Sequence, residues 1–389
     1  MVGPLLEQPW ARSNVGMACD GKPLYDLSTF NQYYFDRLRG FAAAAQARDV
    51  VFIHNFYMQH ALVLLDTYYA DFPWRPRNAI EKLAMPDGVP AGNNFYNIAD
   101  PAKRALHTLY IDKVLDSLGE FPNVVHLVSM QYTGGLEFVR FWIDTIKAWE
   151  ARNGKKVHIS LGATKDVQDA VLLDPVRSKY IRSINLQYWW YRSNGTLFSP
   201  PSAQEIDGRY SSGFESALTS SQQIYRQVRE YREKYPDKAL LHKIAASRQQ
   251  MWAFLMGGGA MLMRYLNYSS AQETNYVAPI ETDTIQATYG FMNRHLRPLL
   301  PKMMPADLAL STTGTTYSLT DSKTVILYYT ERGGSFVADL SEFSGQFQVT
   351  RFVPGSGAET NLGVVTAGGS ATRLSAPSNT DWAILLKKI

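Results

Sequence analysis

Apolar and polar residues follow two different periods along this chain. From about residue 28 to residue 300, short continuous apolar runs are each followed by a segment whose apolar positions recur at helical spacing. After about residue 305, apolar and polar residues alternate with period two between turns rich in Gly, Pro and Ser. The pattern therefore predicts two domains, residues 1–305 and residues 306–389.

The first predicted domain contains six units of a strand followed by a helix. The predicted strands are residues 50–53, 124–128, 157–161, 184–188, 239–244 and 260–264. Strands that alternate with helices form parallel sheets, and continuous apolar strands indicate burial on both faces. Polar and aromatic residues follow nearly every strand, and no Gly-rich phosphate turn is present. We therefore expect an α/β fold, specifically a (β/α)8 TIM-like barrel rather than an open sheet.

Six units leave such a barrel two strands short. Residues 1–27 contain no convincing strand, so the first two strands are cryptic there, absent, or supplied by another chain. We expect Ser28 to cap a helix that continues to Arg48. In the second predicted domain, alternating runs near residues 324–330, 346–352 and 381–386 predict a small antiparallel β-sandwich.

The run Ile184–Tyr191 (Ile-Asn-Leu-Gln-Tyr-Trp-Trp-Tyr) is the most informative stretch for function. Its polar residues, Asn185 and Gln187, alternate with apolar ones, so both amides lie on one face of the predicted strand. Tyr188, Trp189 and Trp190 then supply partly exposed rings with polar tips, an environment that Tyr and Trp tolerate. Rings and neutral amides together favour a saccharide ligand, while a core strand with interface aromatics is the alternative.

Other predicted strand ends carry further candidates for substrate binding. They are His54, Asn55 and Tyr57 after the first strand, Tyr132 after the second, and Lys165 after the third. A histidine such as His54 can hydrogen-bond a sugar or move a proton, and equally serves as a structural hydrogen-bonding group.

Cleavage of a glycosidic bond requires two carboxyl groups on either side of that bond. Asp166 is the clearest strand-end carboxylate, and Lys165 beside it would favour the ionised form, although Asp166 can equally cap the following helix. Glu137 is a further catalytic candidate, although its place in the first turn of a predicted helix favours a structural role. Arg248 can pair with an acidic sugar or with Asp166.

The composition of the chain limits the classes of ligand and partner that we expect it to bind. The chain has 39 basic and 35 acidic residues, a net charge of +4 without long runs, which argues against a nucleic-acid partner. The single cysteine, Cys19, forms no intrachain disulfide, and the sequence predicts neither a metal site nor a cofactor. No signal peptide or membrane-spanning segment is recognisable, and the sequence leaves a homo-oligomer open.

Four segments resemble bacterial (β/α)8 glycoside hydrolases of clan A: residues 30–39, 124–133, 163–169 and 188–191. The chain is most similar to apiosidase-like and related uncharacterised families that carry a C-terminal sandwich labelled collagen-binding. The resemblance covers most of residues 25–389, is more specific for fold than for substrate, and implies an oligosaccharide or polysaccharide side chain as substrate. It also implies a secreted or periplasmic location.

This chain differs from the clan A pattern at two positions. Clan A enzymes have an acid/base Glu after the fourth strand, and the resemblance places that position at Gln131. An amide cannot donate an acidic proton, so this step should fail. The expected seventh strand, residues 239–244, is also followed by no carboxylate. An inactivated variant, a non-catalytic carbohydrate-binding relative, and an enzyme that uses Asp166 all remain open.

Overall fold

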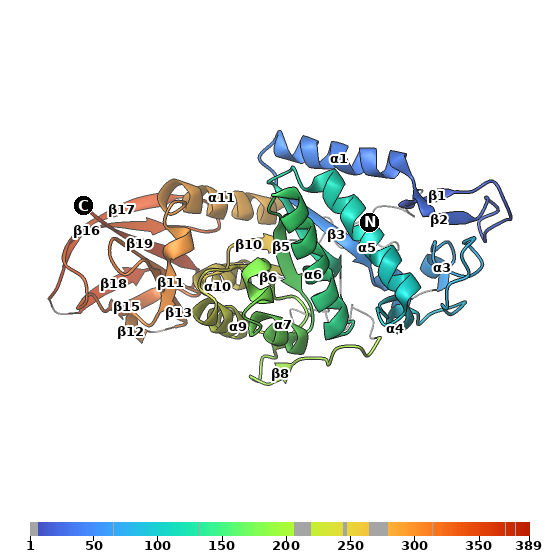
Figure 1. Cartoon of the computed structure of the whole chain (residues 1–389). Coiled ribbons are helices and arrows are strands. Elements are labelled where there is room, and N and C mark those ends of the chain that lie inside the picture. The colour runs from blue at the N-terminus through green and yellow to red at the C-terminus, as the bar shows by residue number, and fades with distance from the viewer. Residues whose placement is uncertain are drawn as a thin grey trace. The chain divides into compact units, whose positions relative to one another are not determined.

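The structure is a computed structural model that describes residues 7–64, 66–130, 132–205, 219–243, 247–263, 279–312, 314–369, 371–377 and 379–389. The chain forms two compact units (Figure 1). Unit 1 comprises Met1–Trp189 and Ser199–Gly213, and unit 2 comprises Trp190–Phe198 and Phe214–Ile389.

Unit 1 alternates strands and helices over most of its length. In chain order its elements are β1 (Trp10–Arg12), β2 (Tyr25–Phe30), α1 (Gln32–Gln46), β3 (Phe52–Met58), α2 (His60–Val63), α3 (Asp66–Tyr69), α4 (Gly92–Phe95), α5 (Pro101–Leu118), β4 (Val124–Met130), α6 (Leu136–Asn153), β5 (His158–Gly162), α7 (Lys165–Leu172), the 3-10 helix η1 (Arg177–Tyr180) and β6 (Ile181–Asn185).

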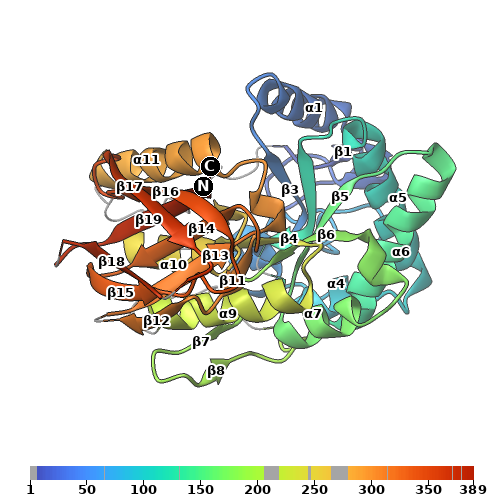
Figure 2. The ribbon, with the colours of Figure 1, turned by 90° about the vertical axis from the view of Figure 1, so that its left-hand side faces the viewer.

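Strands β3, β4, β5 and β6 are parallel neighbours in that order, as the sequence predicts. Helices α5 and α6 pack against each other beside these strands (Figure 2). Helix α5 starts sharply because Asp100 accepts hydrogen bonds from the backbone N–H groups of Ala102 and Lys103 at 2.9 and 3.3 Å, and Pro101 occupies the first helical position. Because the strands are parallel, their carboxyl ends lie at one edge of the sheet.

Two strand boundaries differ from the prediction in ways that matter for the site. Strand β3 continues to Met58, so His54 lies within the strand rather than after it. Strand β6 begins at Ile181 and ends at Asn185, so Gln187 and Tyr188 follow the strand. Short apolar runs mark where a strand exists, but pairing with the neighbouring strand decides where it ends.

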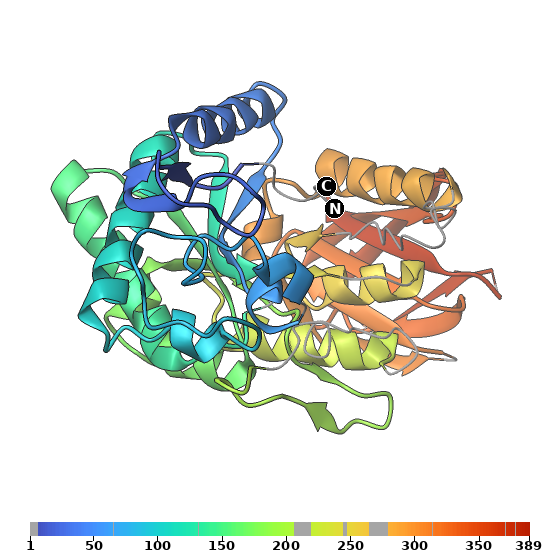
Figure 3. The same cartoon turned by 90° about the vertical axis from the view of Figure 1, so that its right-hand side faces the viewer.

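The N-terminal segment contains secondary structure that its sequence did not reveal. Strands β1 and β2 form a separate antiparallel pair, and Ser28 lies inside β2 rather than at a helix start. The backbone N–H of Ser28 donates to Asp26 at 2.8 Å, and helix α1 begins at Gln32 after Asn31. Figure 3 shows this pair beside the long connection between β3 and α5, which contains three short helices.

Unit 2 begins with the β7–β8 pair and then combines helices with many strands. Its elements are β7 (Trp190–Tyr191), β8 (Leu197–Phe198), α9 (Ser221–Lys234), β9 (Ala239–Lys243), α10 (Arg248–Met256), β10 (Met261–Met263), α11 (Pro279–His295), η2 (Leu300–Lys302), β11 (Met304–Ala306), β12 (Ala309–Thr312), β13 (Thr316–Thr320), β14 (Val325–Thr330), β15 (Gly334–Ala338), β16 (Gly345–Phe352), β17 (Glu359–Ala367), β18 (Thr372–Ala376) and β19 (Trp382–Lys388).

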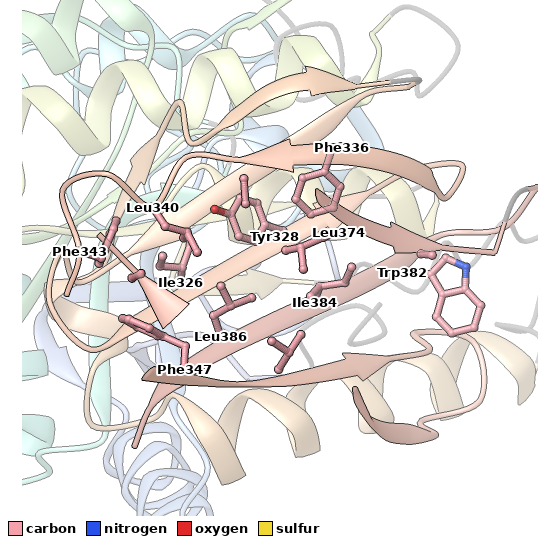
Figure 4. Packing of buried hydrophobic residues seen from close by; sticks show 14 residues of the cluster. Ile326, Tyr328, Phe336, Leu340, Phe343, Phe347, Leu374, Trp382, Ile384 and Leu386 are labelled. Carbon is pink, nitrogen blue, oxygen red and sulfur yellow. The ribbon is translucent and has the colours of Figure 1, made fainter. Parts of the chain in front are cut away.

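The C-terminal strands form two antiparallel sheets around one apolar cluster. Strands β11, β13, β14, β19, β16 and β17 form the larger sheet, and β12, β15 and β18 form the smaller one. Tyr328, Phe347 and Ile384 of the larger sheet meet Phe336 and Leu374 of the smaller sheet in the buried cluster (Figure 4). Alternate residues of each strand thus face a shared core, which is what period-two patterning specifies.

Helices α10 and α11 pack on the same antiparallel strands. Trp252 of α10 stacks on Tyr329 with 4.9 Å between ring centroids, and Phe291 of α11 stacks on Phe352 at 4.2 Å. These contacts place the last helices in one compact unit with the sheets. Strands β9 and β10 are a parallel pair, and the described strands do not close into a barrel.

Candidate functional site

The carboxyl ends of β4, β5 and β6, with the segments that follow β3–β6, form what we call the strand-end site of unit 1. One part of it is a clasp made by Gln59, which follows β3. The Gln59 backbone N–H donates to Ser129 Oγ at 3.0 Å, and its side-chain oxygen accepts from the Thr133 backbone N–H at 2.9 Å. Its side-chain nitrogen also donates to Thr133 Oγ1. All three residues are buried, so the chain is fixed on both sides of position 131.

A second amide, Gln168 of α7, joins the ends of β5 and β6. Its Nε2 donates to the carbonyl oxygens of Leu161 at 3.0 Å and Asn185 at 2.7 Å. Its Oε1 accepts from the indole Nε1 of Trp189 at 2.9 Å. Gln168 is fully buried and satisfies three groups that the ends of the strands would otherwise leave unpaired.

The ring of Tyr188 packs next to Gly162, which has no side chain. A Cβ at Gly162 would lie 3.3 Å from Cε2 of Tyr188 and 3.2 Å from Leu127. Glycine at this position therefore leaves the space that the Tyr188 ring occupies. The Tyr188 hydroxyl accepts from Gln187 Nε2 at 2.7 Å and donates to the Ser129 carbonyl oxygen at 3.4 Å. The ring is thereby tied to the ends of β4 and β5.

Asn185, the last residue of β6, differs from these satisfied amides. Its side chain is fully buried, and neither Nδ2 nor Oδ1 has a hydrogen-bond partner among the described residues. The Oδ1 atom of Asn55 on β3 is likewise buried and unpaired among the residues that the structure describes. Unpaired buried amides are costly, so they require an explanation such as a ligand or ordered water.

Asp166 lies at the exposed rim of this site, in the first turn of α7. It accepts hydrogen bonds from the Val167 backbone N–H at 2.9 Å and from the backbone N–H and hydroxyl of Ser202 at 3.0 and 2.8 Å. Burial raises the pKa of Asp166, but the hydrogen bonds from Thr164, Ser202 and Val167 outweigh it and lower the pKa overall. The carboxylate is therefore held in its ionised form and is unsuited to act as an acid.

Lys165 does not supply the neighbouring charge that the sequence suggested for Asp166. Its Nζ pairs with Asp169 at 2.9 Å, one helical turn away, and lies 4.6 Å from the centroid of the Trp189 ring. The helical spacing of residues 165 and 169 favours that pair over the adjacent residue, because adjacent side chains diverge.

Of the two other catalytic candidates, Glu137 and Gln131, Gln131 lies outside the described residues. Glu137 is exposed in the first turn of α6 and forms an ion pair with Arg140 at 2.7 Å. Of the described carboxyl groups, Asp71 and Asp112 have a raised pKa; Asp71 lies beyond α3 in the long connection after β3, Asp112 lies within α5, and neither comes directly after a strand. The described strand ends therefore contain no acid poised to protonate a leaving group.

Three predicted substrate-binding residues belong to the packed interior. Burial lowers the pKa of His54 to about 3, and its Nδ1 lies 3.4 Å from Nδ1 of His126. Tyr57 is buried and its hydroxyl forms a hydrogen bond with His107 at 2.9 Å. Tyr132 is buried and donates to the Gly135 carbonyl oxygen at 2.7 Å. These residues shape unit 1 rather than line an open site.

The aromatic run 188–191 is not the exposed wall that the sequence suggested. Tyr188 and Trp189 are fully buried in unit 1, while Trp190 and Tyr191 are buried and belong to unit 2. Trp190 packs on Phe198 with 4.1 Å between ring centroids. Sequence spacing does not reveal these partners: Gln187 and Gln168 bond Tyr188 and Trp189 within unit 1, and Phe198 packs on Trp190 within unit 2.

Arg248 does not pair with Asp166, one of its two predicted partners. It lies at the start of α10 in unit 2, where its Nε donates to Oδ2 of Asp381 at 2.7 Å and its Nη2 pairs with Oδ1. The two residues are 133 positions apart, so no local pattern could have indicated this pair.

Sequence reasoning also missed the residues that organise the strand-end site, namely Gln59, Ser129, Thr133, Gln168 and Ser202. All are small or neutral polar residues, which sequence patterns assign to turns and surfaces. Their one signal is position, since most of them follow or end a predicted strand in parallel order.

No group of His, Cys, Asp and Glu in the described part of the chain could hold a metal ion. No helix among the described residues is both long and apolar enough to cross a membrane.

Comparisons with known proteins place this geometry in context. Residues 1–278 match the family described as Domain of unknown function (DUF6298). No curated protein matches the sequence. The fold is similar to a structure described as a glycoside hydrolase, with TM-score 0.53, 10% identity, and 73% of this chain and 69% of that chain covered. It is also similar to a glycoside hydrolase family 5 protein from Bacteroides vulgatus ATCC 8482, with TM-score 0.54, 12% identity, and coverage of 73% and 66%. The chain thus shares its fold with glycoside hydrolases.

Proposed function

From the premise that the chain belongs to the DUF6298 family and has a glycoside hydrolase fold, we propose that it binds an oligosaccharide or a polysaccharide side chain at the strand-end site. One observation carries the proposal. The Asn185 amide is fully buried at the end of β6, and both of its polar atoms lack a partner in the described chain, whereas the neighbouring amides Gln59 and Gln168 are satisfied. A sugar hydroxyl both donates and accepts, so it complements such an amide.

Hydrolysis is the second candidate function, favoured by the likeness in fold to glycoside hydrolases. The acid/base position implied by the resemblance is Gln131, and Asp166 is held ionised by its hydrogen bonds. An ionised carboxylate can act as a base or nucleophile, but a second, protonated group is still required. Binding without cleavage is therefore the primary function that we propose, together with the apiosidase-like relationship and the secreted or periplasmic location.

The decisive experiment compares the parent chain with Asn185→Leu on an array of plant and bacterial glycans. Leucine has nearly the shape of asparagine but offers no hydrogen bond, so we expect affinity to fall about tenfold or more. Stability should be unchanged or higher, because an unpaired buried amide is removed. Asn153→Leu, at the far end of α6, is the matched control and should bind as the parent does.

Glycan binding that survives Asn185→Leu, or no glycan binding by the parent, would refute the proposed site. Hydrolysis is read in the same assay with Gln131→Glu, which restores a carboxyl group at the implied acid/base position. Cleavage that appears only in Gln131→Glu supports descent from a hydrolase, and cleavage by the parent would make catalysis the primary function.

A further inference from the structure

Unit 2 contains a polar pocket of about 570 Å³, within the usual range of about 300–1,000 Å³ for ligand sites. Its lining includes Arg248, Glu331, Arg332 and Asp381, together with Ser221 and Ser247. All of these residues belong to unit 2. The charges come in both signs, so the pocket suits a polar ligand rather than an apolar one.

The side of the pocket formed by Asp381 is a buried ion pair that is already saturated. Asp381 is buried and accepts from Nε and Nη2 of Arg248 and from the Tyr329 hydroxyl at 3.0 Å. This carboxylate therefore offers little to a ligand. The third nitrogen of Arg248, Nη1, has no partner among the described residues, and a Cβ at Gly355 would lie only 3.3 Å from it. A side chain at position 355 would therefore crowd this nitrogen.

The rim of the pocket adds a second guanidinium. Arg332 is exposed, and its guanidinium forms no hydrogen bond or ion pair with any residue that the structure describes, although its backbone carbonyl accepts from the Asn379 N–H at 3.0 Å. Glu331 beside it accepts from the Tyr317 hydroxyl at 2.8 Å through Oε1 only, so Oε2 stays open to a hydroxyl donor. The open groups are thus two cationic donors and one carboxylate oxygen.

Two helices also begin at this pocket. Helix α9 starts at Ser221 and helix α10 starts after Ser247, and both serines are part of the lining. The N-terminal end of a helix carries partial positive charge and favours an anionic group. This field acts in the same direction as the Arg332 guanidinium and the remaining nitrogen of Arg248, Nη1.

We propose that this pocket is a second binding site, specific for an acidic saccharide with a uronic acid unit. The sugar carboxylate would be held by Arg332 and Nη1 of Arg248, and a neighbouring hydroxyl would donate to Glu331. A fully charged phosphate fits less well because Glu331 and Asp381 repel a second negative charge. The inference goes beyond the proposed function, since it concerns unit 2 alone and requires no hydrolysis.

Calorimetric titration of the full chain with a galacturonic acid trimer tests the proposal, with the neutral galactose trimer and inorganic phosphate as comparison probes. We expect saturable binding of the acidic trimer that Arg332→Ala weakens about tenfold, as expected for loss of a charge-assisted contact. Lys323→Ala removes the same charge at the other end of β14 and should bind as the parent does.

The Asn185→Leu variant separates this site from the strand-end site. Acidic-trimer binding that survives Asn185→Leu but is weakened by Arg332→Ala supports the pocket in unit 2. Equal binding of the neutral trimer, displacement of the acidic trimer by inorganic phosphate at similar concentration, or no effect of Arg332→Ala would overturn the proposal. Absence of saturable binding by the parent would overturn it as well.

Discussion

Buried neutral amides organise the strand-end site residue by residue. Gln168 satisfies two backbone carbonyl groups and one indole N–H, and Gln59 fixes the chain on both sides of position 131. Asn185 stands among them with its own amide unpaired within the described chain. A site built in this way recognises hydroxyl groups through hydrogen bonds and needs no net charge to do so.

Gln168→Ala should destabilise the protein by about 2–4 kcal/mol, because it leaves the Trp189 N–H and two strand-end carbonyl groups without their partner in the interior. Urea denaturation followed by tryptophan fluorescence measures the effect. Gln46→Ala, at the exposed end of α1, is the control and should change stability by less than about 0.5 kcal/mol. Equal stability of the two variants would show that the Gln168 contacts contribute little.

At the scale of elements, parallel pairing brings distant histidines together. His54 of β3 lies opposite His126 of β4, and both are buried. Burial lowers the pKa of His54 to about 3 and the pKa of His126 well below its usual value, and the charges of His54 and His158 lower the latter further. The lowered pKa values favour the neutral form of both rings near neutral pH, which suits a sheet core.

This pair predicts loss of stability in mild acid. The folded-state pKa of His54 lies below the unfolded value of about 6.5, so the unfolded chain binds protons first as the pH falls. Stability is fully present above about pH 6.5 and decreases toward pH 3, by about 2 kcal/mol for His54 between pH 6.5 and pH 5.

Unfolding free energies of the parent and His54→Phe at pH 7.5 and pH 5 measure this effect. The variant should lose less stability on acidification than the parent, by about 2 kcal/mol. Gln46→Ala, an exposed position without a titratable group, should keep the pH dependence of the parent. An identical pH dependence in all three proteins would rule out His54 as the source.

At the scale of the whole molecule, the chain forms two compact units. The antiparallel sheets of unit 2 share a cluster that includes Phe347, which is fully buried, whereas Phe41 on α1 is 55% exposed. The two phenylalanines differ in environment and not in chemistry, so they form a matched pair for measuring what the core contributes.

Phe347→Ala should lower the free energy of unfolding by about 3–5 kcal/mol, as expected for loss of a buried aromatic ring and the cavity left behind. Phe41→Ala should change it by less than about 0.5 kcal/mol, because water already reaches that ring. Differential scanning calorimetry of both variants gives the comparison. Similar melting temperatures for the two would contradict a core centred on this cluster.

Periodicity alone determined that β3, β4, β5 and β6 follow one another with helices between them, and that antiparallel sheets come after residue 305. Both depend on the local alternation of apolar and polar side chains, which residues close together in the sequence specify. Tertiary structure decided the site. The pairing of Arg248 with Asp381, the burial of Tyr188 and Trp189, and the satisfaction of Gln168 but not of Asn185 join residues distant in sequence. Burial and long-range hydrogen bonds depend on which segments meet, and that information is absent from any local pattern.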